Sequence, residues 1–167
     1  MIEIRVATDL TPAEYDQLAA LLVAVVDDGA SIGFLPPLAP ADALAYWQGV
    51  LGPNCVLLLA EEDGRIVGSA QLHLEPRANG NHRAEVAKVM VSPVARRRGL
   101  GRAFMERLEQ EARQCGRTLL VLDTREGDPS NILYQAMGYQ EAGRIPGYAR
   151  SANGQLHATV FYFKTLT

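Results

Sequence analysis

An arginine- and glycine-rich stretch, residues 96–102, is the part of this chain whose residue types are best suited to bind an anion. It reads RRRGLGR and joins two segments of different character. Residues 83–91 are rich in Val and contain no breaker, which predicts a strand that ends at Ser92-Pro93 because Pro lacks a backbone donor. After Gly99, apolar residues recur at helical spacing, which predicts a helix packed on a sheet.

The junction between that strand and that helix predicts a site for a diphosphate. Glycine lets an anion approach backbone N–H groups, and a helix N-terminus contributes roughly half a positive charge. Three arginines at this end of a helix are unfavourable unless an anion offsets them. A Walker A loop is excluded because no Lys follows Gly101, and a Rossmann fingerprint is excluded because Phe104 stands at its third glycine position. A basic surface turn without a ligand stays open as the plainer interpretation.

Composition limits the classes of partner. The chain has 167 residues, of which 48% are hydrophobic, so we expect one domain over residues 1–167. A net charge of −3 argues against nucleic acid or an anionic membrane as a partner. No stretch has the apolar character of a signal peptide or a membrane span, so we expect a cytoplasmic protein. We expect Cys55 and Cys115 to be reduced core residues, and the three histidines form no metal-ligand pattern.

The elements that must position the arginine-rich stretch follow from hydrophobic periodicity. Residues 11–14, Thr-Pro-Ala-Glu, predict a capped helix that ends near residue 27, and a second helix is expected from Pro40 to about Gly52. Alternation and apolar runs predict strands at residues 2–7, 55–60, 65–74, 118–122, 139–145 and 156–164, with a short helix after Asp128. The order β-α-α-β-β-β-α-β-α-β-β is an α+β fold: a mixed, mostly antiparallel sheet flanked by helices, with one parallel strand pair.

Arg-x-x-Gly-x-Gly at residues 96–101, directly after Val91-Ser92-Pro93, resembles the coenzyme A loop of the GCN5-related N-acetyltransferases (GNAT). Residues 133–139, LYQAMGY, resemble the second signature of that superfamily, and the order of elements matches its fold. More narrowly, residues 31–34, 45–48, 82–86, 147–148 and 162–166 look like the tabtoxin-resistance acetyltransferases. The resemblance implies the GNAT acyl-CoA N-acyltransferase fold, with acetyl-CoA as cosubstrate.

The resemblance also implies which residues contact the cofactor. They come from the end of the 83–91 strand, from the arginine-rich stretch and from the short helix: Val89, Met90, Val91, Arg96, Arg97, Arg98, Gly99, Leu100, Gly101, Arg102, Ser130 and Tyr134. Many members place Asn seven residues before the helix tyrosine to contact pantetheine, whereas this chain has Gly127. Whether another side chain replaces that Asn is left open.

Three catalytic candidates follow. Tyr134 is suited to give a proton or a hydrogen bond to the departing thiolate, since ordinary pKa values of roughly 10 for Tyr and 8.5 for a thiol are comparable. Alternation places Glu85 on one face of its strand with Ala87, Val89 and Val91, and places Val86, Lys88 and Met90 on the other. Glu85 is suited to accept a proton from an amine, or else to form an ion pair with Arg83 or Lys88. Asp123, at the end of a buried strand, is suited to hold an ammonium, to share the role of base, or to begin a turn.

Two segments are expected to wall the acceptor pocket: the loop with Ser31, Gly33 and Phe34, and the hairpin with Tyr148 and His157. The implied function is acetyl transfer from acetyl-CoA to the amine of a small molecule, such as an amino-acid-like toxin or antibiotic. A non-catalytic acyl-CoA-binding regulator and a protein N-acetyltransferase are the alternatives. The sequence names neither the acceptor nor the oligomeric state, and a homodimer stays open.

Overall fold

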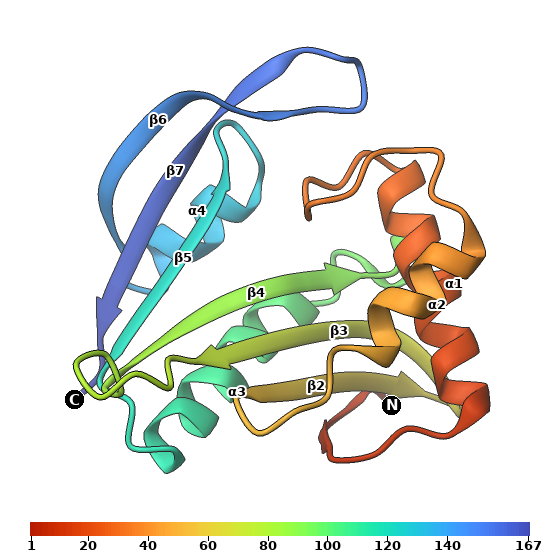
Figure 1. Cartoon of the computed structure of the whole chain (residues 1–167), viewed down its shortest axis with the longest axis horizontal. Coiled ribbons are helices and arrows are strands. Elements are labelled where there is room, and N and C mark those ends of the chain that lie inside the picture. The colour runs from red at the N-terminus through yellow and green to blue at the C-terminus, as the bar shows by residue number, and fades with distance from the viewer.

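The computed structural model describes all residues from Met1 to Thr167, and its strands form one seven-stranded sheet (Figure 1). The strands are β1 (Glu3–Ala7), β2 (Cys55–Glu62), β3 (Arg65–Leu74), β4 (Arg83–Val91), β5 (Leu119–Arg125), β6 (Gln140–Arg150) and β7 (Leu156–Thr165). They lie in the order β1-β2-β3-β4-β5-β7-β6. All neighbours are antiparallel except β4 and β5, which are parallel. The predicted α+β fold with one parallel pair is confirmed.

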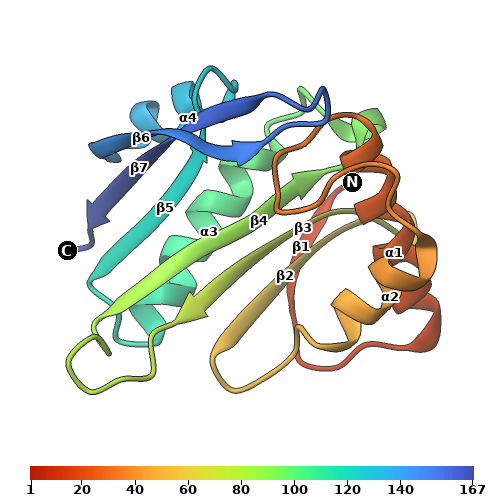
Figure 2. The ribbon, with the colours of Figure 1, turned by 45° about the horizontal axis from the view of Figure 1, so that its top comes forward.

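Helices cover both faces of the sheet, because successive side chains of a strand point to opposite sides. Along β2, Leu57 and Leu59 belong to a core shared with α1 (Pro12–Asp27) and α2 (Pro40–Gln48). Leu58 and Ala60 belong to a second core shared with α3 (Leu100–Gln114). Tyr134 of α4 (Ser130–Ala136) is part of that second core. Figure 2 shows α1 and α2 on one side of the sheet and α3 on the other.

Local sequence signals act at the predicted places. Thr11 Oγ1 accepts a hydrogen bond from the Glu14 N–H at 3.2 Å, and Glu14 Oε2 accepts from the Thr11 N–H at 2.7 Å, so the predicted capping box forms. Asp63 and Gly64 both have positive φ, as a tight turn between β2 and β3 requires. Gly68 in β3 marks a close approach: a Cβ there would lie 2.9 Å from Phe104 Cε2 of α3.

A bulge in β4 overturns the predicted alternation of that strand. Gln71 pairs with Ala87 and Ser69 pairs with Met90, so two residues along β3 match three along β4. Lys88 takes up the extra residue with a φ of +53°, outside the ordinary strand region. Val86 therefore packs in the core with α3 while Met90 packs in the core with α1 and α2.

The same bulge separates Glu85 from the residues predicted to share its face. Val89 and Val91 pack against the core on the α3 side, to which the neighbours of Glu85 in sequence, Ala84 and Val86, also belong. Glu85 points to the opposite side by alternation. The predicted faces of Val89, Val91, Lys88 and Met90 are wrong, because no glycine or proline in the strand signals the extra residue.

The two parallel strands pair only where they begin. Their register runs from Arg83–Leu119 to Glu85–Val121, and β4 and β5 then diverge toward their carboxyl ends (Figure 1). On its other edge β5 stays paired with β7 as far as Arg125–Thr159, and β6 pairs with β7 beyond it. The sheet is thus split between β4 and β5, and both strands present their carboxyl ends to the split.

Several predicted details differ from the structure. α2 ends at Gln48, four residues before Gly52, and β5 continues past Asp123 to Arg125. Cys115 caps the C-terminal end of α3 and is exposed, and Cys55 is half-buried, so neither is a core residue. Both are free thiols, as predicted. None of the helices combines the length and the apolar character that a membrane span requires.

Candidate active site

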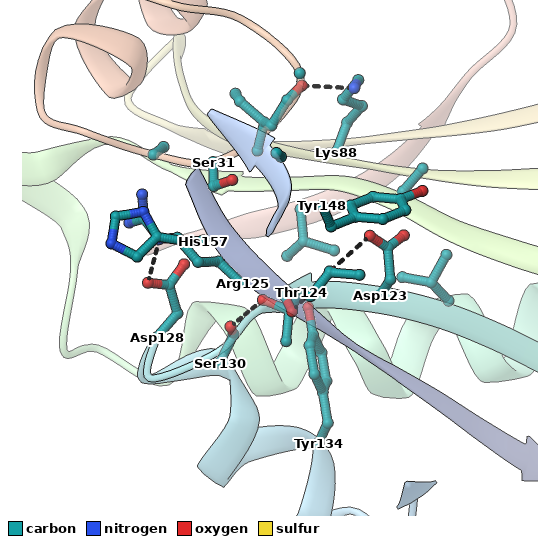
Figure 3. A pocket seen from close by; sticks show the side chains of 18 of the residues that line it. Ser31, Lys88, Asp123, Thr124, Arg125, Asp128, Ser130, Tyr134, Tyr148 and His157 are labelled. Atoms are coloured by element: carbon teal, nitrogen blue, oxygen red, sulfur yellow. Dashed lines mark hydrogen bonds and ion pairs between the residues drawn. The ribbon is translucent and has the colours of Figure 1, made fainter. Parts of the chain in front are cut away.

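A cavity of about 370 Å³ lies at the split between β4 and β5 (Figure 3). This volume is within the range of small-molecule sites, roughly 300–1,000 Å³. Its lining comes from the loop after α1, the bulged part of β4, the end of β5, α4 and the β6–β7 hairpin. Nine of the predicted site residues line it: Ser31, Gly33, Glu85, Val89, Asp123, Ser130, Tyr134, Tyr148 and His157.

Tyr134 reaches the cavity from α4 and is held by aromatic packing. Its ring centroid lies 5.9 Å from that of Tyr139 and 6.0 Å from that of Tyr162, and its side chain is buried. Burial, assisted by the negative charges of Asp123 and Asp128, raises the pKa of Tyr134 to about 12. The phenol therefore stays protonated at neutral pH and is available as a hydrogen-bond donor.

This raised pKa changes the role expected of Tyr134. Complete proton transfer to a thiolate of ordinary pKa, roughly 8.5, would be uphill by about three orders of magnitude. Donation of a hydrogen bond to that thiolate needs no such transfer. The environment of Tyr134 favours the donor role over the easy proton exchange that unperturbed acidities predict.

Glu85 and Asp123 reach the cavity from the two diverging strands. Glu85 is aligned with Val121 of β5, and Asp123 lies two residues farther along β5, on the same face of the sheet. Both side chains are exposed, and neither forms an ion pair within 4.0 Å. Solvent accessibility removes the desolvation cost that a carboxylate among apolar residues would carry.

The structural alternatives considered for the two carboxylates are not formed. Arg83 pairs with Glu75 at 3.3 Å instead of with Glu85. Asp123 Oδ2 accepts a hydrogen bond of 3.1 Å from Thr159 Oγ1, and no backbone N–H of residues 125–127 donates to it. Both carboxylates therefore keep free acceptor oxygens toward the cavity.

Lys88 is a cavity residue that the sequence prediction placed on the wrong face of β4. Its Nζ donates a hydrogen bond of 2.6 Å to the carbonyl oxygen of Ile32 and lies 5.7 Å from the centroid of the Phe34 ring. Burial lowers the pKa of Lys88, while the charges of Asp123 and Glu85 oppose this effect. A single lysine in an apolar strand marks Lys88 as unusual. The face to which its side chain points, however, is set by the bulge, which the sequence does not indicate.

Residues 29–34, here called the acceptor loop, close one side of the cavity. Lys88 fixes this loop at Ile32, and Arg125 Nη2 fixes it at the Gly29 carbonyl with a bond of 3.2 Å. Ser31 and Gly33, which we expected in an acceptor pocket, both line this cavity, and their part in acceptor binding stays a prediction. The Phe34 ring packs edge-on against Tyr46, with centroids 5.1 Å apart, and lies beneath Lys88. Phe34 therefore packs beneath Lys88 and does not line the cavity itself.

The hairpin side of the cavity is held by a chain of polar contacts. Arg125 Nε donates to Asp128 Oδ1 at 2.9 Å, and Arg125 Nη1 donates to Ser151 Oγ at 3.1 Å. Ser151 Oγ and His157 Nδ1 share a hydrogen bond of 2.6 Å. Tyr148 packs edge-on against Phe161 at 5.7 Å. Arg125 and Asp128 were not predicted as site residues, because only the tertiary contact with Ser151 shows their role.

The side chains near Gly127 are already engaged within the protein. Asn131 Nδ2 donates to the carbonyl oxygens of Arg125 and Asp128 at 2.9 Å each, and Asn131 Oδ1 accepts from the Tyr162 hydroxyl at 2.8 Å. Ser130 Oγ shares a hydrogen bond of 2.7 Å with Thr124 Oγ1. The polar side-chain atoms of Asn131 and Ser130 thus all have partners within the protein.

The predicted cofactor loop, residues 96–102, lies outside the cavity at the N-terminal end of α3. Residues 96–99 are exposed, and the backbone N–H groups of residues 97–102 donate to no acceptor in the protein. Gly99 has a φ of +78°, and a Cβ there would meet no atom within 4 Å. A Cβ on Gly101 would lie 3.4 Å from Leu133 Cδ2, so α3 begins close against α4. The loop thus combines free donors with open space.

Two arginines of this loop are paired with acids of the chain itself. Arg98 forms two hydrogen bonds with Glu62, of 2.9 and 2.6 Å, and Arg96 pairs with Asp28 at the end of α1. All four side chains are at least a quarter exposed. Of the strand residues predicted beside the cofactor, Met90 is 3% exposed and belongs to the core, and Val91 also does not line the cavity.

A hydrogen-bonded trio beside the cavity was not anticipated. Gln71 Nε2 donates to the Tyr46 hydroxyl at 3.0 Å, and Gln71 Oε1 bonds His73 Nε2 at 2.8 Å. Gln71 is 1% exposed, and His73 is aligned with Glu85 across β3 and β4. No spacing in the sequence indicates this contact, because Tyr46 comes from α2, 25 residues before Gln71.

Comparison with known proteins shows that residues 31–139 match the acetyltransferase (GNAT) family. An uncharacterised N-acetyltransferase from the hisH–hisA intergenic region of Azospirillum brasilense is 39% identical over 105 residues, which are 60% of this chain and 62% of that protein. An L-amino acid N-acyltransferase of Escherichia coli (strain K12) is 29% identical over 104 residues, 62% of this chain and 60% of that protein. The chain spans about three fifths of the length of these two relatives.

A solved structure supports the same fold. A Salmonella typhimurium protein determined with its cofactor acetyl-CoA superposes with a TM-score of 0.82 at 22% identity, covering 100% of this chain and 95% of that one. Because the match extends over nearly the whole of both chains, the two molecules share their overall fold.

Proposed function

Because the chain belongs to the acetyltransferase (GNAT) family, we propose that it transfers the acetyl group of acetyl-CoA to the amine of a small molecule. One observation carries this proposal: Tyr134, Glu85 and Asp123, from three different elements, line the same cavity. A protonated phenol beside two free carboxylates suits acetyl transfer from a thioester to an ammonium, which has to lose a proton before it can attack.

The loop at residues 97–102 fits the diphosphate of acetyl-CoA. Its unpaired N–H groups, the positive end of the α3 dipole and the open space at Gly99 suit a group with several negative oxygens. Arg96 and Arg98 are exposed, so exchanging their present carboxylates for a diphosphate costs little. Acetyl-CoA supplies the activated acetyl thioester.

We assign the side chains of the cavity separate roles. Glu85, exposed and unpaired, accepts the proton of the acceptor ammonium, directly or through water. Asp123, fixed by Thr159, holds the positive charge of that ammonium. The Tyr134 phenol donates a hydrogen bond to the sulfur as negative charge develops on it.

We infer that the acceptor is amino-acid-like. The cavity is of small-molecule size, and the E. coli relative carries the name of an L-amino acid N-acyltransferase. Residues 31–34 and 82–86, which suggest the tabtoxin-resistance subgroup, supply the acceptor loop and the first half of β4. That narrower relationship, and a role against toxins or antibiotics, stays a prediction.

Free-thiol release from acetyl-CoA, measured with a panel of amines and checked by the mass of the product, tests the proposal. We expect turnover with amino acids and other small amines. Binding of coenzyme A without acetylation of any amine would identify an acyl-CoA-binding regulator instead. Acetylation confined to peptide or protein substrates would identify a protein N-acetyltransferase.

A further inference from the structure

We propose that Lys88 binds a carboxylate of the acceptor, so that the preferred acceptors are amino acids and not simple amines. The inference rests on the proposed acetyl transfer in this cavity and adds to it a residue that determines specificity. It comes from the state of the Lys88 ammonium, from the space beside it, and from the distribution of charge around the cavity.

The Lys88 ammonium is only partly satisfied by the protein. It has three N–H donors, and one of them bonds the Ile32 carbonyl at 2.6 Å. No carboxylate lies within 4.0 Å of it, whereas the other lysine of the chain, Lys164, contacts Glu109 at 2.8 Å. A half-buried cation bonded to one neutral oxygen is unfavourable unless an anion completes its surroundings.

Gly33 leaves the Lys88 ammonium uncrowded on the side of the acceptor loop. A Cβ on Gly33 would lie 3.0 Å from Lys88 Nζ, so any larger residue would press on the ammonium. Gly33 also has a φ of +91°, which other residues adopt only with strain. Lys88 itself is fixed by the β4 bulge and by the Phe34 ring beneath it. The ammonium is therefore held in place before a ligand arrives.

The cavity separates its charges in the way an amino acid requires. Asp123 and Glu85 act on Lys88 through their charge but form no contact with it, so their oxygens stay free for an ammonium. Arg125, the other cation of the lining, is engaged by Asp128, Ser151 and the Gly29 carbonyl. Figure 3 shows Lys88 and Asp123 reaching the cavity from different strands. Lys88 is thus the cation that is available to a ligand.

The test compares an amino acid with its own amide as acceptors, for example L-methionine with L-methioninamide. For each we measure kcat/KM by free-thiol release, in the wild type and in Lys88→Met. The two acceptors differ in amine pKa, but that difference cancels when the acid-to-amide ratio of one protein is compared with that of another. Arg77→Met is the matched control, because Arg77 is an exposed cation in the β3–β4 loop and does not line the cavity.

We expect Lys88→Met to lower the acid-to-amide ratio by about 10-fold to 100-fold, the range for a charge-assisted hydrogen bond, mainly through KM of the acid. Arg77→Met should leave the ratio unchanged within about a factor of two. Equal losses for acid and amide in Lys88→Met would overturn the inference and make Lys88 a catalytic base or a structural residue. Calorimetric binding of coenzyme A verifies that Lys88→Met is folded.

If Lys88→Met does not fold, a binding measurement on the wild type alone tests the inference. Calorimetry of the coenzyme A complex with N-acetyl-L-methionine and with its amide should show tighter binding of the acid. Equal binding of the two would overturn the role of Lys88. Failure of the wild type to acetylate any amine would instead contradict the proposed function.

Discussion

The cofactor loop and the acceptor cavity hold their positive charges in opposite ways. In the loop, Arg96 and Arg98 are exposed and paired with Asp28 and Glu62. In the cavity, Lys88 is half-buried and bonded only to the Ile32 carbonyl. Exposed ion pairs contribute about 0–1 kcal/mol, so the arginines can exchange partners easily. Lys88 has no carboxylate partner within 4.0 Å, so a ligand anion would not have to displace one.

This difference implies a division of work. The loop is expected to give affinity for any coenzyme A thioester, since it offers unpaired backbone N–H groups and exposed arginines. The cavity is expected to select the acceptor and to carry the reaction, since its groups are fixed by packing and by hydrogen bonds. Variants in one region should therefore leave the function of the other intact.

Tyr134→Phe is expected to have the largest effect on turnover. It removes the hydrogen-bond donor but keeps the ring that packs on Tyr139 and Tyr162, so kcat should fall by ~10²-fold or more while coenzyme A binds normally. The pKa of Tyr134 is raised to about 12, so the phenol ionises only as pH approaches that value. The loss should thus be constant from pH 7 to about pH 10. Turnover within a factor of two of the wild type would make Tyr134 structural.

Gly101→Asp should damage the loop without damaging the cavity. The new carboxylate would stand at the N-terminus of α3, where it suits the helix dipole but repels a diphosphate. We expect calorimetry to show coenzyme A binding weakened by about 10-fold or more. Gly101→Ala, which adds only a Cβ 3.4 Å from Leu133 Cδ2, is the control and should bind nearly as well as the wild type. Unchanged affinity in a folded Gly101→Asp protein would refute the loop assignment.

Glu85→Gln and Asp123→Asn should separate the base from the anchor within the cavity. Without its base the protein reacts only with amine that is already deprotonated. Glu85→Gln should therefore chiefly lower kcat, and the acidic limb of the kcat–pH profile should move toward the pKa of the amine. Loss of the anchor weakens ground state and transition state alike, so Asp123→Asn should chiefly raise KM. Steady-state kinetics across pH measure both effects. A KM effect in Glu85→Gln and a kcat effect in Asp123→Asn would exchange the two roles.

Asp28→Asn is expected to give the smallest effect, and in the opposite direction. It frees Arg96 from its carboxylate, so coenzyme A should bind about two- to threefold more tightly, and added salt should reduce the gain. Glu62→Gln, which frees Arg98, should act in the same way. Weaker binding in both variants would mean that the two arginines do not transfer to the ligand.

Much of the fold could be predicted because its signals are local. The capping box of α1, the turn at Asp63-Gly64, the close approach at Gly68 and the strand–loop–helix around residues 83–114 all depend on neighbouring residues. Periodicity predicted the order of elements, and the family resemblance suggested Tyr134, Glu85 and Asp123, which the structure brings to one cavity.

The acceptor side was harder because its contacts are distant in sequence. Lys88 enters the cavity only through a bulge that no glycine or proline indicates, and it meets Ile32 across 56 residues. Arg125 reaches Gly29 across 96 residues. Phe34, an aromatic residue in the predicted pocket wall, proves to support Lys88 from below. The sequence indicated that a pocket lies in this region, but only the packing of distant segments shows which side chains face it.

The central claim is that the loop binds the cofactor while the cavity brings its sulfur to Tyr134. A crystal structure of the complex with coenzyme A and an N-acetyl amino acid tests it most directly, through the distance from Tyr134 Oη to the coenzyme A sulfur. We expect a hydrogen bond between these atoms, with the diphosphate on the N–H groups of residues 97–102. A sulfur that lies outside the split between β4 and β5, beyond hydrogen-bond reach of Tyr134, would contradict the account.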